Sequence, residues 1–278
     1  MKAFSTLNQY NQAVKQPLKS SAFSLRPVIE HVYAEHLSHH YARKYVKLCP
    51  KASSLARHGK VVPRPNHGLA HTLRSIKLAP LVAKYYQRYA NNADLFHFTK
   101  EDIYKIQVAL AFFVVGRENE MGFQDNPAIY NEFRLNSAQA FKHYCQEHLM
   151  HLFKTQYEID RYAGILLNYA DPVNQSKEAV IIRQSHCLDL LRCRNWEELK
   201  GGVMQEIQSD FNRSGKVKEL IDYTAKLLLA TGNRIPDGPY KERCHFNRFA
   251  ECSTNIDYCL DQLNAVPLPS LSRKVKRY

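Results

Sequence analysis

The sequence lacks any uninterrupted apolar run approaching the roughly 18–20 residues that a membrane-spanning helix needs. Its longest apolar stretches are Val108–Val115 and Tyr162–Leu167. No apolar segment of the signal-peptide kind follows the early lysine at Lys2. We therefore expect a soluble protein without a signal peptide or a transmembrane segment.

Paired cysteines are also missing. The seven cysteines are an odd number and include no Cys-x-x-Cys pair, the spacing that structural zinc sites commonly use. A chain of 278 residues is long enough to form a core without disulfide bonds, so we interpret the cysteines as reduced thiols. The sequence predicts no metal site and no cofactor.

Strand-type alternation is scarce, and the chain has only 10 glycines. Helical periodicity takes its place, and Pro80 is expected to kink or break one of the helices. We predict an all-α fold, a single domain over residues 1–278 with residues 196–232 as a candidate helical cap lobe. The predicted helices are Val28–Lys47, Leu69–Tyr89, Asp102–Val115, Pro127–Met150, Glu158–Asn168, Lys177–Leu191, Trp196–Phe211, Lys216–Ala230 and Ala250–Leu263.

Positive charge is in excess, with a formal net charge of +13. Such an excess indicates an anionic partner, which includes nucleic acid, a membrane surface, a nucleotide or an acidic protein face. The basic residues are scattered apart from small clusters at Arg43–Lys60 and Arg273–Arg277, and no glycine-aromatic RNA-binding signature accompanies them. We therefore favour a phosphate site over nucleic acid binding, with a solvated basic surface as the alternative.

The run RPNHGLAHTLR at residues 64–74 is the first candidate site. Pro65 and Asn66 end a preceding element, so His67 should lie at or near a helix N-terminus, where backbone N–H groups and the helix dipole favour anions. His71 shares that helical face, and Arg74 follows one turn later. Three interpretations stay open: a metal-binding pair, a nucleophile or base with a supporting histidine, or two structural histidines.

Two further runs carry polar groups. Residues 116–120 (GRENE) follow the most apolar stretch of the chain and would bring Arg117, Glu118 and Glu120 to the rim of a core, although a solvated helix end is the favoured interpretation of this segment taken alone. Residues 183–193 (RQSHCLDLLRC) form a helix in which Asp189 and Arg192 lie three and six positions after His186. A lone histidine of this kind is more often structural than functional.

These three segments, in this order, resemble the phosphodiesterase domain of the Legionella SidE effector family and the related Dup enzymes. The resemblance covers nearly the whole chain, and residues 64–74 are its most specific part, supported by SHCLDLLRC at 185–193. It implies that His67 attacks the phosphodiester with the help of a glutamate and that His186 acts as acid and base. The glutamate is Glu118 or Glu120, and we prefer Glu118.

The resemblance also implies substrates and partners. Family members act on ADP-ribosylated ubiquitin or on phosphoribosyl-linked ubiquitin, which they transfer to a substrate serine or remove from it. The implied partners are ubiquitin and serine-modified host proteins, and the implied location is that of a secreted bacterial effector inside the host cell. These 278 residues leave no room for the ADP-ribosyltransferase domain of the SidE proteins. The chain would therefore use ubiquitin activated elsewhere, remove the modification, or be a fragment.

The remaining predictions concern substrate binding and the alternatives. Arginine suits phosphate because its planar fork binds two oxygens. An HD-type metal-dependent nucleotide phosphohydrolase needs a His-Asp dipeptide, which the sequence lacks; a non-catalytic basic binding module is the non-enzymatic alternative. For the phosphodiesterase, we predict that both histidines and one glutamate converge in one cleft. The substrate-binding candidates are Arg64, Asn66, His71, Arg74, Arg117 and Arg192.

Overall fold

The computed structural model describes residues 24–37, 67–118, 126–168, 176–190, 207, 209–211, 214–230, 256–267 and 269. Helices dominate these residues, which contain no β-strand and only one isolated bridge, between Ala90 and Phe211. The all-α prediction is confirmed. The helices are α2 (Arg26–Val32), α5 (Leu69–Tyr89), α6 (Lys100–Phe112), α7 (Pro127–His148), α8 (Met150–Phe153), α9 (Gln156–Asn168), α10 (Lys177–Asp189), α13 (Ser214–Ala230) and α15 (Ile256–Asn264), with a π-helical turn η1 (Tyr33–Leu37) and a 3-10 turn η2 (Ala93–Leu95).

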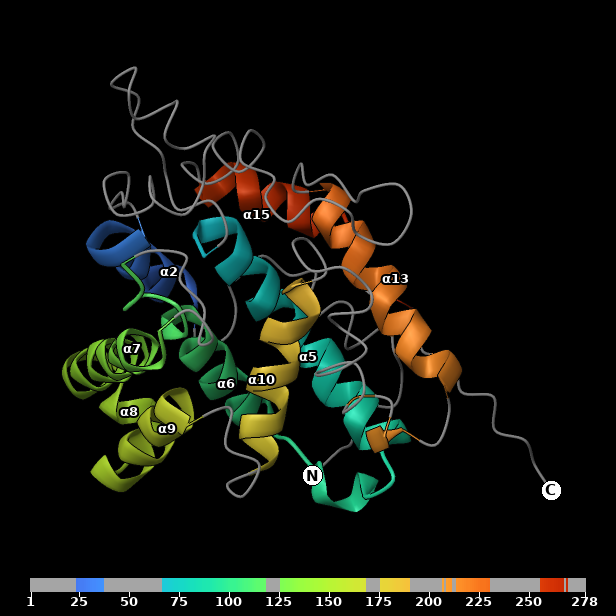
Figure 1. The fold of residues 1–278 in the computed structure, drawn as a ribbon, viewed down its shortest axis with the longest axis horizontal. Helices are drawn as coiled ribbons and strands as arrows, with labels where there is room; N and C mark the ends of the chain where they lie inside the picture. The colour runs from blue at the N-terminus through green and yellow to red at the C-terminus, as the bar shows by residue number, and fades with distance from the viewer. Residues whose placement is uncertain are drawn as a thin grey trace.

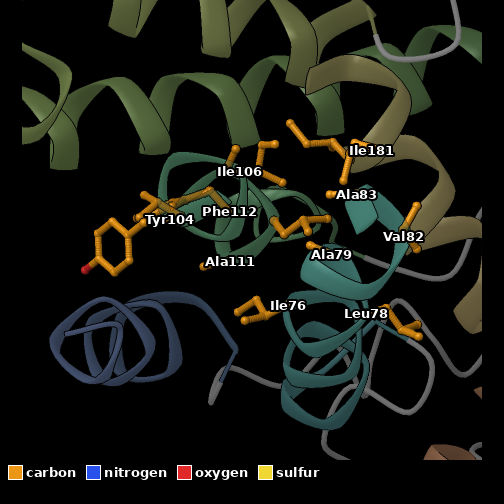
Figure 2. Packing of buried hydrophobic residues seen from close by; sticks show 14 of the residues in the cluster. Ile76, Leu78, Ala79, Val82, Ala83, Tyr104, Ile106, Ala111, Phe112 and Ile181 are labelled. Atoms are coloured by element: carbon orange, nitrogen blue, oxygen red, sulfur yellow. The ribbon is translucent and has the colours of Figure 1, made fainter. Parts of the chain in front are cut away.

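Helices α5, α6 and α10 pack against one another in the middle of the described fold (Figure 1). The α7–α9 group covers one side of α6, and α13 and α15 pack on α5. Figure 2 shows Val82 of α5, Ile106 of α6 and Ile181 of α10 among the core side chains, and all three are completely buried. Burial of each such side chain contributes about 1.5–3 kcal/mol. This apolar packing holds α5 and α10, the two helices that carry most of the site described below, in a fixed position relative to each other.

Pro80 lies inside α5, which continues from Leu69 to Tyr89, so of the predicted kink or break the break does not occur. A proline has no N–H group and leaves the carbonyl four residues earlier without its helical donor. That carbonyl belongs to Ile76, and it accepts a hydrogen bond of 3.1 Å from the Gln107 side chain on α6. A neighbouring helix therefore replaces the bond that Pro80 removes.

The Gln107 contact gives a stability prediction. Gln107→Leu keeps the side-chain volume but leaves the Ile76 carbonyl without that donor, so we expect the free energy of unfolding to fall by about 1–2 kcal/mol. Urea denaturation measures the change. Gln146→Leu is the control, because Gln146 lies on the exposed surface of α7; a change there as large as the one at Gln107 would contradict this explanation.

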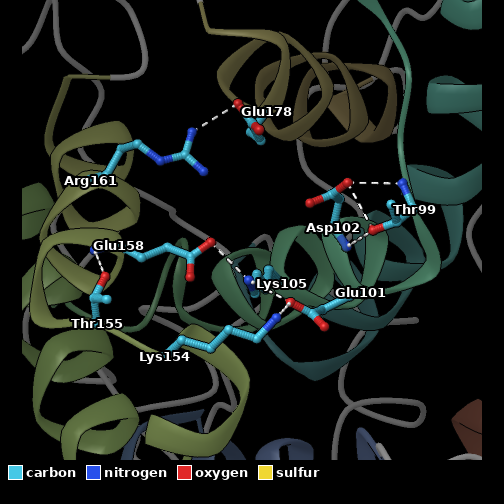
Figure 3. A network of polar contacts seen from close by, with 9 residues as sticks. All are labelled: Thr99, Glu101, Asp102, Lys105, Lys154, Thr155, Glu158, Arg161 and Glu178. Carbon is cyan, nitrogen blue, oxygen red and sulfur yellow. Dashed lines mark hydrogen bonds and ion pairs between the residues drawn. The ribbon is translucent and has the colours of Figure 1, made fainter.

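Polar contacts connect α6, α9, α10 and the turn that follows α8 (Figure 3). The buried Lys105 ammonium lies 2.7 Å from Glu158 and 3.0 Å from Glu101, and Arg161 contacts Glu178 at 3.0 Å. A buried lysine is tolerated when carboxylates compensate its charge. The network therefore holds α9 against α6 and α10.

Several predicted boundaries move. Helix α6 begins at Lys100 because Thr99 and Asp102 form a capping box, and it ends at Phe112, earlier than predicted. Within the predicted helix 28–47, the described part divides into α2 and η1. No helix of the described residues is long and apolar enough to cross a membrane.

The predicted cap lobe is described only in part. Most of the predicted helix 196–211 lies outside the described residues. Helix α13 packs against α5, α10 and α15, and its Glu219 accepts a hydrogen bond of 2.7 Å from Tyr85. A separate cap lobe over residues 196–232 stays a prediction.

Candidate active site

The N-terminal turns of α5 lie beside the C-terminal turns of α10 (Figure 1). His67 directly precedes the N-cap residue Gly68, so it lies where the sequence predicts, next to a helix N-terminus. Gly68 is extended, and its carbonyl accepts hydrogen bonds from the Thr72 backbone at 3.1 Å and the Thr72 hydroxyl at 3.2 Å. These bonds fix the first turn, which leaves His67 partly exposed and turns His71 into the interior.

Four side chains form a continuous polar chain between α5 and α10. Asp189 accepts two hydrogen bonds from Arg74, from Nε at 2.5 Å and from Nη2 at 3.2 Å. Its Oδ2 lies 2.5 Å from His71 Nδ1, and His71 Nε2 lies 3.1 Å from His186 Nδ1. Exposure rises along the chain from 0% at Arg74 and Asp189, through 1% at His71, to 6% at His186. These four hydrogen-bonded side chains therefore connect the core to the edge of the site.

The buried carboxylate determines the tautomer of His71. An ionised carboxylate only accepts hydrogen bonds, so His71 Nδ1 carries the proton and donates it to Asp189. Arg74 compensates the negative charge of Asp189, and both charges are completely buried. Removal of either partner would leave an uncompensated charge in the core, which is strongly destabilising.

Three imidazole rings form one cluster. The ring centroids of His67 and His186 are 6.3 Å apart with 25° between their planes, and His71 lies 5.4 Å from His67 and 4.9 Å from His186. Phe113, just after the end of α6, packs on the His186 ring at 4.5 Å. The fold thus brings together two histidines that are distant in the sequence.

His186 also lines a recess formed with the end of α6 and the start of α7. None of the described residues lining the recess is acidic, and two are arginines. The Arg117 guanidinium lies 5.4 Å from the Tyr130 ring and 5.6 Å from the Phe133 ring, in the range of cation–π contacts. The lining residues are Phe113, Val114, Arg117, Tyr130, Phe133, Arg134 and His186.

Gly116 positions the end of α6 against α7. A Cβ atom at this residue would lie 2.3 Å from the Phe133 carbonyl oxygen and 2.6 Å from the Ser137 nitrogen, so only glycine fits this approach. The Gly116 N–H donates to Ser137 Oγ at 3.0 Å. The close approach directs Arg117 into the recess and leaves Glu118 exposed immediately after it.

The remaining predicted residues are placed unevenly. Four of the predicted residues lie outside the described residues: Arg64, Asn66, Glu120 and Arg192. The predicted contact of His67 with Glu118 or Glu120 stays a prediction. The complete burial of Arg74 and the near-complete burial of His71 argue against their predicted direct contact with substrate, because a substrate would have to enter the core. No group of described side chains is arranged to hold a metal ion.

The sequence did not predict the contacts of Asp189 with His71 and Arg74 or the position of Arg134 in the recess. A signal existed for each. Asp189 follows Leu188 on a helix whose neighbouring residues are apolar, and a carboxylate in such a setting needs a buried partner. Arg134 lies four residues after Tyr130, which places both on one face of α7.

Comparisons with known proteins agree with this fold. A family model of the SidE phosphodiesterase (PDE) domain matches residues 32–236. Two relatives from Legionella pneumophila subsp. pneumophila strain Philadelphia 1, the ubiquitinating enzyme SidE and the ubiquitinating/deubiquitinating enzyme SdeA, are 29% and 27% identical over 150 residues. Each alignment covers 49% of this chain and 10% of the relative. The chain thus matches about a tenth of the length of these relatives.

Solved structures show the same likeness. The C-terminal domain of lpg1496 from Legionella pneumophila is 26% identical, with a TM-score of 0.73 over 92% of this chain and 100% of that chain. Crystals of lpg1496 under 350 MPa gave a structure with a TM-score of 0.76 and 25% identity over the same shares. A complex of the domain with nucleotide, at 24% identity and a TM-score of 0.73 over 91% of this chain and 99% of that chain, supports the fold alone.

Proposed function

The chain belongs to the SidE phosphodiesterase family, and from that premise we propose that it cleaves a phosphodiester by a two-histidine mechanism. The observation that carries the proposal is the pair of facing rings of His67 and His186, 6.3 Å apart at the edge of the site. A nucleophile approaches its target to about 3–3.5 Å before reaction. A general acid reaches its acceptor at about 3 Å. The separation of the rings is on the scale that lets them flank a phosphorus atom.

The two histidines have different tasks. In the first step a ring nitrogen of His67 forms a bond to phosphorus, the bond to the leaving oxygen breaks, and that oxygen takes a proton from His186. In the second step a hydroxyl group of serine or water gives its proton to His186 and attacks phosphorus, which releases His67. Glu118 or Glu120 would orient His67 and stabilise the charge that develops on it.

The arginines that line the recess beside His186 are the proposed contacts for the anionic part of the substrate. Arg117 and Arg134 bring two guanidinium groups to its lining, and a guanidinium can bind two phosphate oxygens at once. Arg64 and Arg192 remain candidates for the same task. Arg74 was a further candidate from the sequence, but Asp189 compensates its charge in the core, so we assign phosphate binding to Arg117 and Arg134 first.

The proposed substrate is ADP-ribosylated ubiquitin or a serine-linked phosphoribosyl-ubiquitin conjugate. The relatives' names include both ubiquitinating and deubiquitinating activity. The proposed two-histidine centre would serve both reactions, because each breaks a bond from phosphorus to a leaving oxygen and then passes the phosphorus to a hydroxyl group of serine or water. The proposed partners are ubiquitin and serine-modified host proteins. The proposed place of action, as a secreted effector in the host cell, follows the same likeness.

One experiment tests the substrate and the metal requirement together. We expect incubation with ADP-ribosylated ubiquitin, or with the serine-linked conjugate, to change the intact mass of the ubiquitin species, and we expect a chelator to leave the rate unchanged, since two histidines supply attack and proton transfer. Activity lost in chelator and restored by manganese or zinc would favour the HD-type alternative. No turnover of either conjugate would favour a binding module.

A further inference from the structure

We propose that Asp189 and His71 are positioning residues that determine which ring nitrogen of His186 exchanges protons with the substrate. The inference rests on the acid and base role proposed for His186 above. Its basis is the buried chain from Arg74 through Asp189 and His71 to His186. Neither Asp189 nor His71 needs to touch the substrate for this role.

The hydrogen bonds determine the proton positions in turn. His71 donates from Nδ1 to the Asp189 carboxylate, so the neutral ring presents the lone pair of Nε2 to His186. His186 Nδ1 lies 3.1 Å from His71 Nε2 and must then be the donor. With Nδ1 occupied in this way, proton exchange at His186 falls to Nε2. A proton at Nε2 makes the His186 ring cationic. When that proton is transferred to the leaving oxygen, the ring returns to the neutral Nδ1–H form.

Burial strengthens this control. The contact between His71 and Asp189 and that between Arg74 and Asp189 lie where side-chain exposure is 2% or less, so water screens them little. Phe113 packs on the His186 ring and limits its rotation. Asp189 thus acts at His186 through His71, just as the proposed glutamate would act directly at His67. Each catalytic histidine then has its own carboxylate.

Other charged groups face His186 and enter any pH dependence. On α5 these are His67 and His71, with Arg74 behind Asp189, and the recess adds one arginine from the end of α6 and one from α7. Among the described residues these groups include His67, His71, Arg74, Arg117, Arg134 and Asp189.

Two substitutions at one position separate the two contacts of His71. The amide of glutamine reaches about as far as Nε2, so His71→Gln keeps an acceptor for His186 Nδ1 and loses the bond to Asp189. The shorter asparagine mimics Nδ1, so His71→Asn keeps the bond to Asp189 and loses the one to His186. We expect turnover to fall roughly 100-fold in His71→Asn, which is the lower end of the roughly 10²–10⁴-fold contribution of acid–base catalysis, and to fall less in His71→Gln.

The direct readout is the tautomer of His186, obtained from the side-chain ¹⁵N chemical shifts of histidine-labelled protein. At pH values at which His186 is neutral, we expect its Nδ1–H form in the wild type and in His71→Gln, and a mixture of both tautomers in His71→Asn. In the rate profile, the alkaline fall in cleavage should move to lower pH in His71→Gln, because the link between the carboxylate and the cationic ring is lost. His143→Gln, an exposed histidine on α7, serves as the control.

The outcomes separate this inference from the proposed function. A wild-type His186 in the Nε2–H form, or folded Asn and Gln variants with the same tautomer and the same pH profile as the wild type, overturns the positioning role. If the wild type cleaves no diester, the proposed function fails, while the tautomer measurement needs no substrate and still decides the role. Asp189→Asn is a weaker test, because it leaves Arg74 buried without its counter-charge and can unfold the protein.

Discussion

Replacing His67 with alanine is expected to lower diester cleavage by on the order of 10⁴-fold or more and to remove every covalent phosphoryl-enzyme species. His67 is partly exposed, whereas His71 and His186 are buried, so His67 is the histidine of the cluster that is placed to reach a substrate from solvent. His71 cannot take over as nucleophile, because its Nδ1 contacts Asp189 and its Nε2 contacts His186. The rate of cleavage and the intact mass of acid-quenched enzyme measure the two effects.

The control for this experiment is His143→Ala, which removes a histidine whose side chain is 74% exposed on α7. We expect its rate and its adduct to match the wild type. Full activity in His67→Ala, or an adduct that still accumulates in that variant, would show that the role of nucleophile is assigned to the wrong residue.

Replacing His186 with alanine is expected to have the second largest effect, and of a different kind. The variant keeps the nucleophile but lacks the acid for the leaving oxygen and the base for the second step, so turnover should fall about 10²–10⁴-fold. With a good leaving group, such as p-nitrophenol in a nucleotide p-nitrophenyl diester, the first step needs no acid. A phosphoryl adduct on His67 should then accumulate, because its resolution still needs the base.

The measurement is a burst of p-nitrophenol followed by the mass of the quenched enzyme. A double variant, His67→Ala with His186→Ala, should show neither the burst nor the adduct. Normal turnover of the natural conjugate by His186→Ala would sink the assignment, as would an adduct located on another residue.

The fold could be predicted from the sequence because helix formation leaves a periodic local pattern. The start of α5 after Pro65 and Asn66 is one example, and the helix that carries His186 is another. The start of α6 lies two residues before the predicted one because Thr99 and Asp102 make reciprocal capping contacts. The helix does not break at Pro80 because the donor to the Ile76 carbonyl comes from Gln107 on a different helix, which no local pattern shows.

The site could be predicted only as far as its residue types allow. The sequence placed His67 and His71 on one helical face, but the partner of His71 is 118 positions away, and no local pattern connects the two. For the same reason Arg74 was assigned to a substrate phosphate, whereas its guanidinium contacts a buried carboxylate. A single sequence shows that a charge occurs in an apolar segment, and the tertiary fold decides what compensates it.

The ion pair between Arg74 and Asp189 has a consequence for the order of folding. The two residues are 115 positions apart, and neither charge can be buried before the other helix docks, since an unpaired charge in the core costs several kcal/mol. During synthesis the first turns of α5 therefore stay exposed to solvent until α10 has left the ribosome. The catalytic histidines then come together in the same event that closes the core, so a chain interrupted before α10 would hold His67 and His71 without forming an active centre.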